Sequence, residues 1–465
     1  MPLTDCRGVP VSTDNATALA ALEEAHDLFL GYFNDPLAPV EEALAEDPSF
    51  VMGHCYRAGL HVISSEKGAV PELAKSVEAA EALSATANER ERGHMAAARA
   101  WLAGDYHRAA ALYGEVLVKY PHDLIALQIG HQCDFLLGQS SMLRDRVSWV
   151  LPQWSESQPG YGYLLGMHAF GLEEMGDYGR AEQAGRRAVE ICPGDTWAIH
   201  AVAHVLEMQG RLEEGVEWLA GRSDDWSPDN GFAFHNWWHL ALYHLDLGQV
   251  DRVLELYDQS IHPAPTEVAL ELVDAVSLLW RLRLRGIDVG NRWTELADTY
   301  EPVAEDGYYA FNDMHAMMCF TADERPAAAD RLLQCLERTA GGTDSNAMMT
   351  REVGLPVARA IKAFARGDYG TCVSLLLPVR ALAHRFGGSH AQRDVIQQTL
   401  IEATLRDGNG ALGRALANER TQLKPTSAFN WSSTARAASL LGDGAGAERA
   451  TARAHALQTT ASVAA

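Results

Sequence analysis

The chain has 465 residues, of which 47% are hydrophobic, 8% aromatic and 22% charged, a balance typical of folded proteins and unlike that of disordered chains. Its 62 acidic residues outnumber 38 Lys and Arg, and the net charge of −24 repels a nucleic-acid backbone, which excludes nucleic acid as an expected partner. Since the sequence has neither an apolar run long enough to cross a membrane nor an export signal, we expect a cytoplasmic protein without a membrane partner.

Two segments of the chain carry the same pattern of turn and packing residues. Residues 104–126 and 176–198 share Gly, Asp, Tyr, Ala, Pro, Asp and Ala at matching offsets, and they begin 72 residues apart, or two units of 36. The glycine supplies a left-handed turn after one helix, the small Ala lets the next helix approach closely, and Pro ends that second helix. The pattern predicts one helical hairpin per unit and resembles the tetratricopeptide repeat.

Further turn glycines continue the repeat, so that successive steps from Gly104 are 34, 38, 34, 38 and 38 residues, at positions 138, 176, 210, 248 and 286. The next such turn, at Gly367, follows a longer gap, which indicates an insertion or a degenerate unit. No segment shows the alternation of a strand. We predict an all-α, tetratricopeptide-like helical-hairpin solenoid, a superhelix, as a single domain over residues 1–465, clearest at 104–286, with 451–465 as a frayed helical tail.

Five segments give the chain a more specific likeness: PSFVMGH (48–54), DTWAIHAVAHVLEM (195–208), FHNWWHLALY (234–243), FNDMH (311–315) and GGSHAQRDV (387–395). With these segments the chain resembles the tetratricopeptide repeat protein 38 family, in its bacterial form, over roughly residues 5–427. The resemblance implies a fold and a set of recurring polar residues, and it brings no established reaction with it.

Histidines repeat at helical spacing on two neighbouring predicted helices. His200 and His204 lie four residues apart with Glu207 three residues further on, and His235 and His239 repeat the spacing 35 residues downstream. Neighbouring helices lie about 10 Å apart, so these imidazoles can reach a shared point. Imidazole suits Zn, Fe, Cu or Ni, which makes a divalent transition metal the candidate cofactor, although HxxxH lacks the glutamate of the hydrolytic HExxH motif.

Chemistry without a metal would be acid–base catalysis by the same four histidines, tuned by Glu207 or Asp274. Asp274 lies on a polar stripe with Ser277 and Arg281, which either lines the same pocket or forms a hydrogen-bonded packing network. Tryptophans beside the histidines would make the pocket apolar, as small-molecule sites usually are, although Trp is also ordinary core in repeat helices. The candidate ligand-binding residues are Trp197, Trp238, Asp274, Asn312, Asp313, His315, His131 and His168.

Three functions fit these patterns. The first is a small-molecule enzyme or binding protein built around the histidines, and the second is an adaptor that holds a peptide or protein partner in the inner groove. A groove for a chain-terminal carboxylate should carry Lys, Arg and Asn, whereas the predicted inner helices carry His, Trp, Asn and Glu, which favours the small molecule. In the third, the histidines only support the structure, and a His200→Ala variant should lose stability but no binding function.

Overall fold

The computed structural model describes residues 3–463, with side chains through residue 458. Every regular element in this part of the chain is a helix, and the extended residues form only two isolated bridges, Thr4 with Pro10 and Phe33 with Asn230. The predicted all-α, tetratricopeptide-like hairpin fold is therefore confirmed. Among the described helices, none combines the length and the apolar character that crossing a membrane requires.

The chain forms two compact units. Unit 1 comprises Met1–Val202, Asp224–Ala233 and Thr343–Asn346. Unit 2 comprises Ala203–Ser223, Phe234–Gly342 and Ala347–Ala465. Four helices have residues in both units: α11 (Thr196–Met208), α13 (Ser223–Trp226), α14 (Ala233–Asp246) and α20 (Ser345–Met349). The single continuous solenoid stays a prediction.

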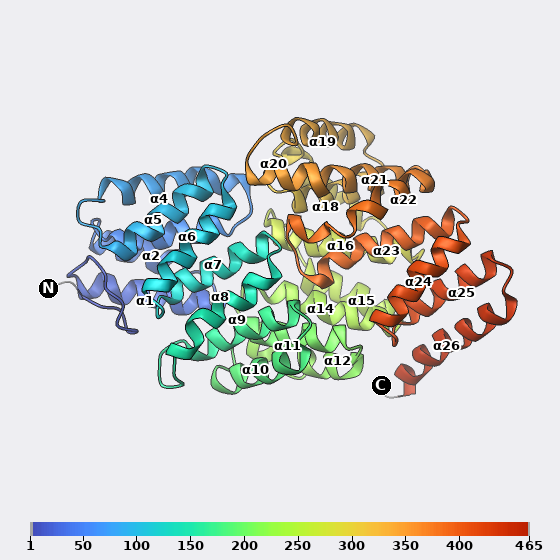
Figure 1. The fold of residues 1–465 in the computed structure, drawn as a ribbon, viewed down its shortest axis with the longest axis horizontal. Helices are drawn as coiled ribbons and strands as arrows, with labels where there is room; N and C mark the ends of the chain where they lie inside the picture. Colours follow the sequence, from blue (N-terminus) through green and yellow to red (C-terminus); the bar gives the residue numbers. More distant parts are fainter. Residues whose placement is uncertain (1–2, 464–465) are drawn as a thin grey trace. The chain divides into compact units, whose positions relative to one another are not determined.

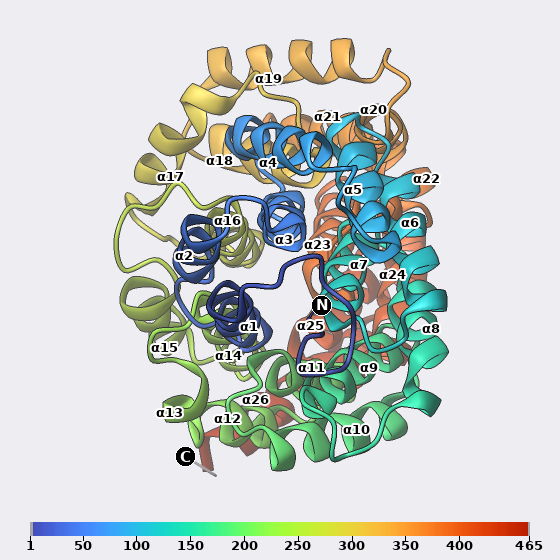
Figure 2. The same cartoon turned by 90° about the vertical axis from the view of Figure 1, so that its left-hand side faces the viewer.

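Unit 1 is a series of helical hairpins, drawn from blue to green in Figure 1. Its helices are α1 (Ala16–Leu30), α2 (Leu37–Glu46), α3 (Val51–Val62), α4 (Val70–Ala82), α5 (Glu89–Leu102), α6 (Tyr106–Lys119), α7 (Leu124–Leu136), α8 (Ser140–Val150), α9 (Tyr161–Glu174) and α10 (Tyr178–Ile191). Consecutive helices pack against each other, most extensively α9 with α10 and α5 with α6. The segment before α1 has no helix of its own, as Figure 2 shows in dark blue, and Pro10 accepts hydrogen bonds from the side chains of Asn88 and Arg90.

Unit 2 continues the same architecture. Its remaining helices are α12 (Leu212–Ala220), α15 (Val250–Leu256), α16 (Ala269–Leu284), α17 (Arg292–Tyr300), α18 (Ala310–Ala322), α19 (Pro326–Thr339), α21 (Leu355–Ala365), α22 (Tyr369–Val379), α23 (His390–Arg406), α24 (Gly410–Leu423), α25 (Ala428–Leu440) and α26 (Gly444–Val463). Here α16 also packs on α18 and on α23, so it lies among helices from three different repeats. Helix α26 includes most of the segment expected to fray, and residues 464–465 lie outside the described part.

The turn glycines adopt the conformation that the repeat predicts. Gly104, Gly138, Gly176, Gly210, Gly248, Gly286 and Gly367 all have φ between 62° and 82°. The gap before Gly367 contains a hairpin whose turn lacks glycine: Glu324, 38 residues after Gly286, joins α18 to α19 with φ 55°. A longer second part follows, in which a π-helical turn at Thr350–Gly354 leads into α21. The gap therefore holds a degenerate unit and an insertion.

The aspartates two residues after Pro121 and Pro193 cap the helices that follow. The carboxylate of Asp123 accepts the Ala126 backbone N–H at 3.0 Å at the start of α7. Asp195 accepts the Ala198 backbone N–H at 2.9 Å at the start of α11. Each aspartate thereby satisfies a helix N–H group that lacks a partner within its own helix. This cap fixes where α11, the helix with the first histidine pair, begins.

Candidate functional site

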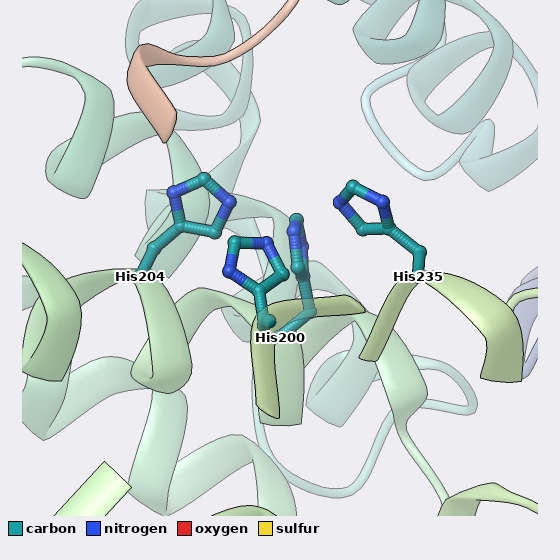
Figure 3. A group of neighbouring side chains, drawn as sticks. His200, His204 and His235 are labelled. Carbon is teal, nitrogen blue, oxygen red and sulfur yellow. The ribbon is translucent and has the colours of Figure 1, made fainter. Parts of the chain in front are cut away.

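The predicted histidines converge. His204 on α11 and His235 and His239 on α14 belong to unit 2, and His200 lies one turn before His204 on the same helix, which holds the two on one face. One ligand nitrogen from each of the four lies within 4.8 Å of the others. Figure 3 shows the imidazoles grouped around a common space. The expectation that the two HxxxH pairs meet is confirmed.

Buried carboxylates orient two of these imidazoles. His235 Nδ1 lies 2.6 Å from Asp274 Oδ2, and His239 Nδ1 lies 3.2 Å from Glu207 Oε2. An ionised carboxylate only accepts hydrogen bonds, so Nδ1 of each imidazole is the donor. Asp274 comes from α16 and Glu207 from α11, one turn after His204. The sequence predicts that Asp274 or Glu207 tunes a histidine. In the structure each of the two carboxylates is hydrogen-bonded to one histidine.

Burial sets the protonation of two histidines in the cluster. The exposed fraction is 0% for His204 and His239, 5% for His235 and 0% for Asp274. Burial lowers the pKa of His204 to about 3, and it also takes the pKa of His239 well below the usual histidine range. These two imidazoles are therefore neutral at pH 7, which is the form that binds metal ions.

Trp238 forms one wall of the cluster. Its ring stacks on His235 at 5.3 Å between centroids and meets His239 edge-on at 4.9 Å. Its indole N–H donates to Ser277 Oγ at 2.9 Å, and Ser277 in turn donates to the Asp274 carbonyl. The polar stripe on α16 therefore does both things the sequence allowed: Asp274 contacts a histidine, and Ser277 forms a packing network that fixes the tryptophan.

The predicted pocket residues of unit 1 lie in an aromatic cluster. Trp197 stacks on Tyr32 at 5.7 Å and contacts His131 at 5.9 Å and His200 at 5.0 Å. His131 is fully buried, and burial lowers its pKa to about 3. His168 on α9 is also buried, 3.5 Å from Ser148 Oγ. Around Trp197 the aromatic rings pack closely together, and the binding of a ligand by these residues stays a prediction.

Asn312, Asp313 and His315 lie on α18 of unit 2. His315 Nδ1 donates to the carbonyl of Phe311 on its own helix at 2.9 Å. Asp313 is buried, and burial raises its pKa to about 7, with Asp306 adding to the rise. The role of these three residues in ligand binding stays a prediction.

One residue that contacts the cluster carries no signal in the sequence. Lys424, directly after α24, is 8% exposed and donates to Glu207 Oε1 at 2.7 Å. Glu207 therefore binds His239 with one oxygen and a lysine with the other. The two residues are 217 positions apart, and no repeat offset connects them.

No protein-family model matches the chain. Among solved structures, the chain is similar to the human IFIT1 dimer with m7Gppp-AAAA, at 14% identity and a TM-score of 0.43, covering 96% of this chain and 95% of that one. The Naa15/Naa10 complex bound to HypK-THB gives 13% identity and a TM-score of 0.27 over 97% of this chain and 71% of that one. The P58(IPK) TPR domain gives 16% identity and a TM-score of 0.22, over 85% of this chain and 99% of that one. The chain is a tetratricopeptide-like helical repeat protein.

Proposed function

We propose that the chain is a cytoplasmic enzyme, akin to the tetratricopeptide repeat protein 38 family, which transforms a small molecule with the help of one transition-metal ion. The ion binds Nε2 of His235 and His239 together with His204 and His200. The observation that supports the proposal is the pair of buried carboxylates on Nδ1 of His235 and His239. Metal-binding histidines almost always donate their other N–H to such a partner, which fixes the ring and raises its basicity.

The spacing of the ligand atoms fits one ion. Zinc binds imidazole nitrogen at about 2.0–2.1 Å, so two nitrogens on one zinc ion lie at most about 4.2 Å apart. The four histidine nitrogens lie within 4.8 Å of one another, so small side-chain rotations bring them to a shared ion. An all-imidazole set suits Zn, Cu, Fe or Ni. Such an ion supplies Lewis-acid chemistry, by polarising a substrate oxygen or activating water.

Burial argues against the adaptor. A groove that holds a peptide must present its contact residues to the partner, whereas His204, His239 and Trp238 are 0% exposed. A purely structural cluster would not need several imidazoles with two separate carboxylates, since burying each charge costs free energy that only a good partner offsets. A small molecule that enters through a neighbouring pocket can reach the buried histidines, and its binding would account for the cluster of imidazoles and carboxylates.

The test is the metal content of protein purified without chelators. We expect about one transition-metal ion per chain by elemental analysis, and its loss from the double variant His204→Ala, His239→Ala. The matched control is His94→Ala, because His94 is also buried and also binds a carboxylate, Asp123, at 2.8 Å in unit 1. This control should keep the metal.

Circular dichroism and urea unfolding show whether the double variant folds. A folded double variant that keeps its metal contradicts the proposal, and so does a wild type that is free of metal and takes up neither Zn²⁺ nor Co²⁺ on titration. If His200→Ala lowers stability while the metal content stays at the wild-type level, His200 supports the structure and is not a metal ligand.

A further inference from the structure

Unit 2 contains a charged pocket beside the histidine cluster. Side chains from α11, α14, α16, α23, α24 and α25 line it. Its cations are Arg281, Arg285, Arg420 and Lys424, and its carboxylates are Glu207, Asp246 and Asp394. The pocket therefore carries one more positive than negative charge, in a protein whose net charge is −24.

Three of the four cations have a carboxylate partner. The pairs are Arg285 with Asp246 at 2.9 Å, Arg420 with Asp394 at 2.7 Å, and Lys424 with Glu207 at 2.7 Å. Each pair neutralises itself. The excess positive charge of the pocket is therefore that of Arg281.

Arg281 is buried without an anion. It is 2% exposed, and it donates to the carbonyls of Ser277 at 3.0 Å and Ala391 at 2.6 Å. Among the side chains that the structure describes, no carboxylate lies within ion-pair distance of it. By contrast, the buried Arg146 of unit 1 binds the carboxylate of Asp134 with two nitrogens. A buried charge without a counter-charge is unfavourable, and an anionic ligand would offset that cost.

The pocket also contains N–H groups that are available to donate hydrogen bonds. Arg285 Nη1 is buried and makes no hydrogen bond, and Lys424 has three N–H groups, of which Glu207 takes one. Asp246 and Arg285 stand at the open side, with side chains 20% and 14% exposed. The free space, about 20 Å³ for the centre of a water molecule, holds one or two waters, so the group that replaces them is small.

Two residues join this pocket to the histidines. Glu207 lines the pocket and accepts from His239, and the guanidinium of Arg281 lies 5.2 Å from the ring centre of Trp238. The same ring also contacts His235 and His239. A molecule anchored between Arg281 and Arg285 would therefore be close to the imidazoles.

We propose that this pocket binds the carboxylate group of a small substrate, with Arg281 supplying the balancing charge and Arg285 and Lys424 supplying N–H donors. The substrate class is thus a small carboxylic acid. That it is also transformed rests on the metal centre proposed above, whereas its binding does not. Two guanidinium groups one helical turn apart on α16 suit a planar carboxylate.

Acetate is the probe, and saturation-transfer NMR detects its binding to the protein as purified. Inorganic phosphate is tested in parallel. We expect acetate to bind the wild type and to bind Arg281→Met at least about tenfold more weakly, since a charge-assisted hydrogen bond is worth about 1.5–3 kcal/mol. Arg281→Lys should retain part of the binding because it keeps the charge. The matched control is Arg283→Met, which lies on α16 but does not line the pocket.

Failure of this proposal is separable from failure of the metal centre. Metal content is measured on the same samples, so a metal-free wild type that binds acetate contradicts the metal centre alone. No acetate binding by the wild type, or equal binding by wild type and Arg281→Met, overturns the pocket. Equal losses in the Met and Lys variants assign Arg281 a structural role, and binding of phosphate but not acetate overturns the carboxylate.

Discussion

Both units bury a histidine against an aspartate, and the two pairs differ in what surrounds them. In unit 1, Asp123 accepts from His94 and also from two nitrogens of the Arg90 guanidinium, at 2.6 and 3.0 Å. In unit 2, Asp274 accepts from His235, whose neighbours are other imidazoles. Burial opposes ionisation of Asp123, but Arg90 and His94 outweigh it and lower the pKa of that carboxyl well below its usual value. A buried histidine–carboxylate pair is therefore not a site in itself; convergence with further histidines makes it a candidate.

The largest effect should come from removing the carboxylate of unit 1. Asp123→Ala leaves the buried Arg90 with only the carboxylate of Asp5, 3.7 Å away, and α7 without its cap, so we expect a loss of about 3–5 kcal/mol in the free energy of unfolding. Urea unfolding measures it, with metal content as a second readout that should not change. A loss below about 1 kcal/mol would place this pair in the same class as the surface ion pairs.

The corresponding change in unit 2 should act on metal binding. Asp274→Ala leaves no buried cation unpaired, but it releases the ring of His235, so we expect metal affinity to fall about 10- to 100-fold in competition with a chelator. Asp274→Asn is the control for size. If Asp274→Ala costs as much stability as Asp123→Ala and leaves metal affinity unchanged, the contrast between the two pairs is lost.

Two further buried aspartates, one in each unit, allow the pH dependence of stability to be compared between the units. Burial raises the pKa of Asp195 in unit 1 and of Asp313 in unit 2 to about 7, from a usual value of 3.8. Below about pH 4 both states are protonated and stability is complete; as pH rises toward 7 only the unfolded state loses its proton, so stability falls. Asp313→Asn should remove its part of this fall, which is at most about 4 kcal/mol at pH 8 because the two pKa values differ by about 3 units. Melting temperatures from pH 4 to 8 test it; an unchanged slope contradicts it. Asp195→Asn should behave alike because Asn also caps helices.

The smallest effect concerns the turns. Glu324 in unit 2 has φ 55° where the repeat places glycine, so Glu324→Gly should raise stability by about 0.5–1 kcal/mol. Gly176→Ala in unit 1 is the reverse test, because φ is 79° there and an added Cβ meets nothing within 4 Å. It should lower stability by a similar amount. Thermal unfolding of both variants would show whether glycine is the more stable residue at both turns.

Local patterns in the sequence predict what local geometry decides. Turn glycines, helix caps and the HxxxH pairs follow from offsets within one hairpin, so the all-α fold and the convergence of the histidines could be predicted. Glu324 was missed because a non-glycine residue in a left-handed turn leaves no mark in the pattern. Lys424 and the unpaired state of Arg281 depend on packing between repeats far apart in the chain, which spacing does not encode. The assignment of His131 and Trp197 to unit 1, and of His235 and His239 to unit 2, likewise became visible only in the structure.

The bond between Glu207 and Lys424 also bears on how the protein is made. Synthesis delivers the residues of unit 1 first, and most hairpins can close as soon as their own helices have left the ribosome. Glu207 must wait for 217 more residues before its lysine exists. Closing so long a loop is costly, and the histidine cluster acquires its full charge balance only near the end of translation. Chains shortened before residue 424 would therefore keep folded early hairpins but lack a finished site.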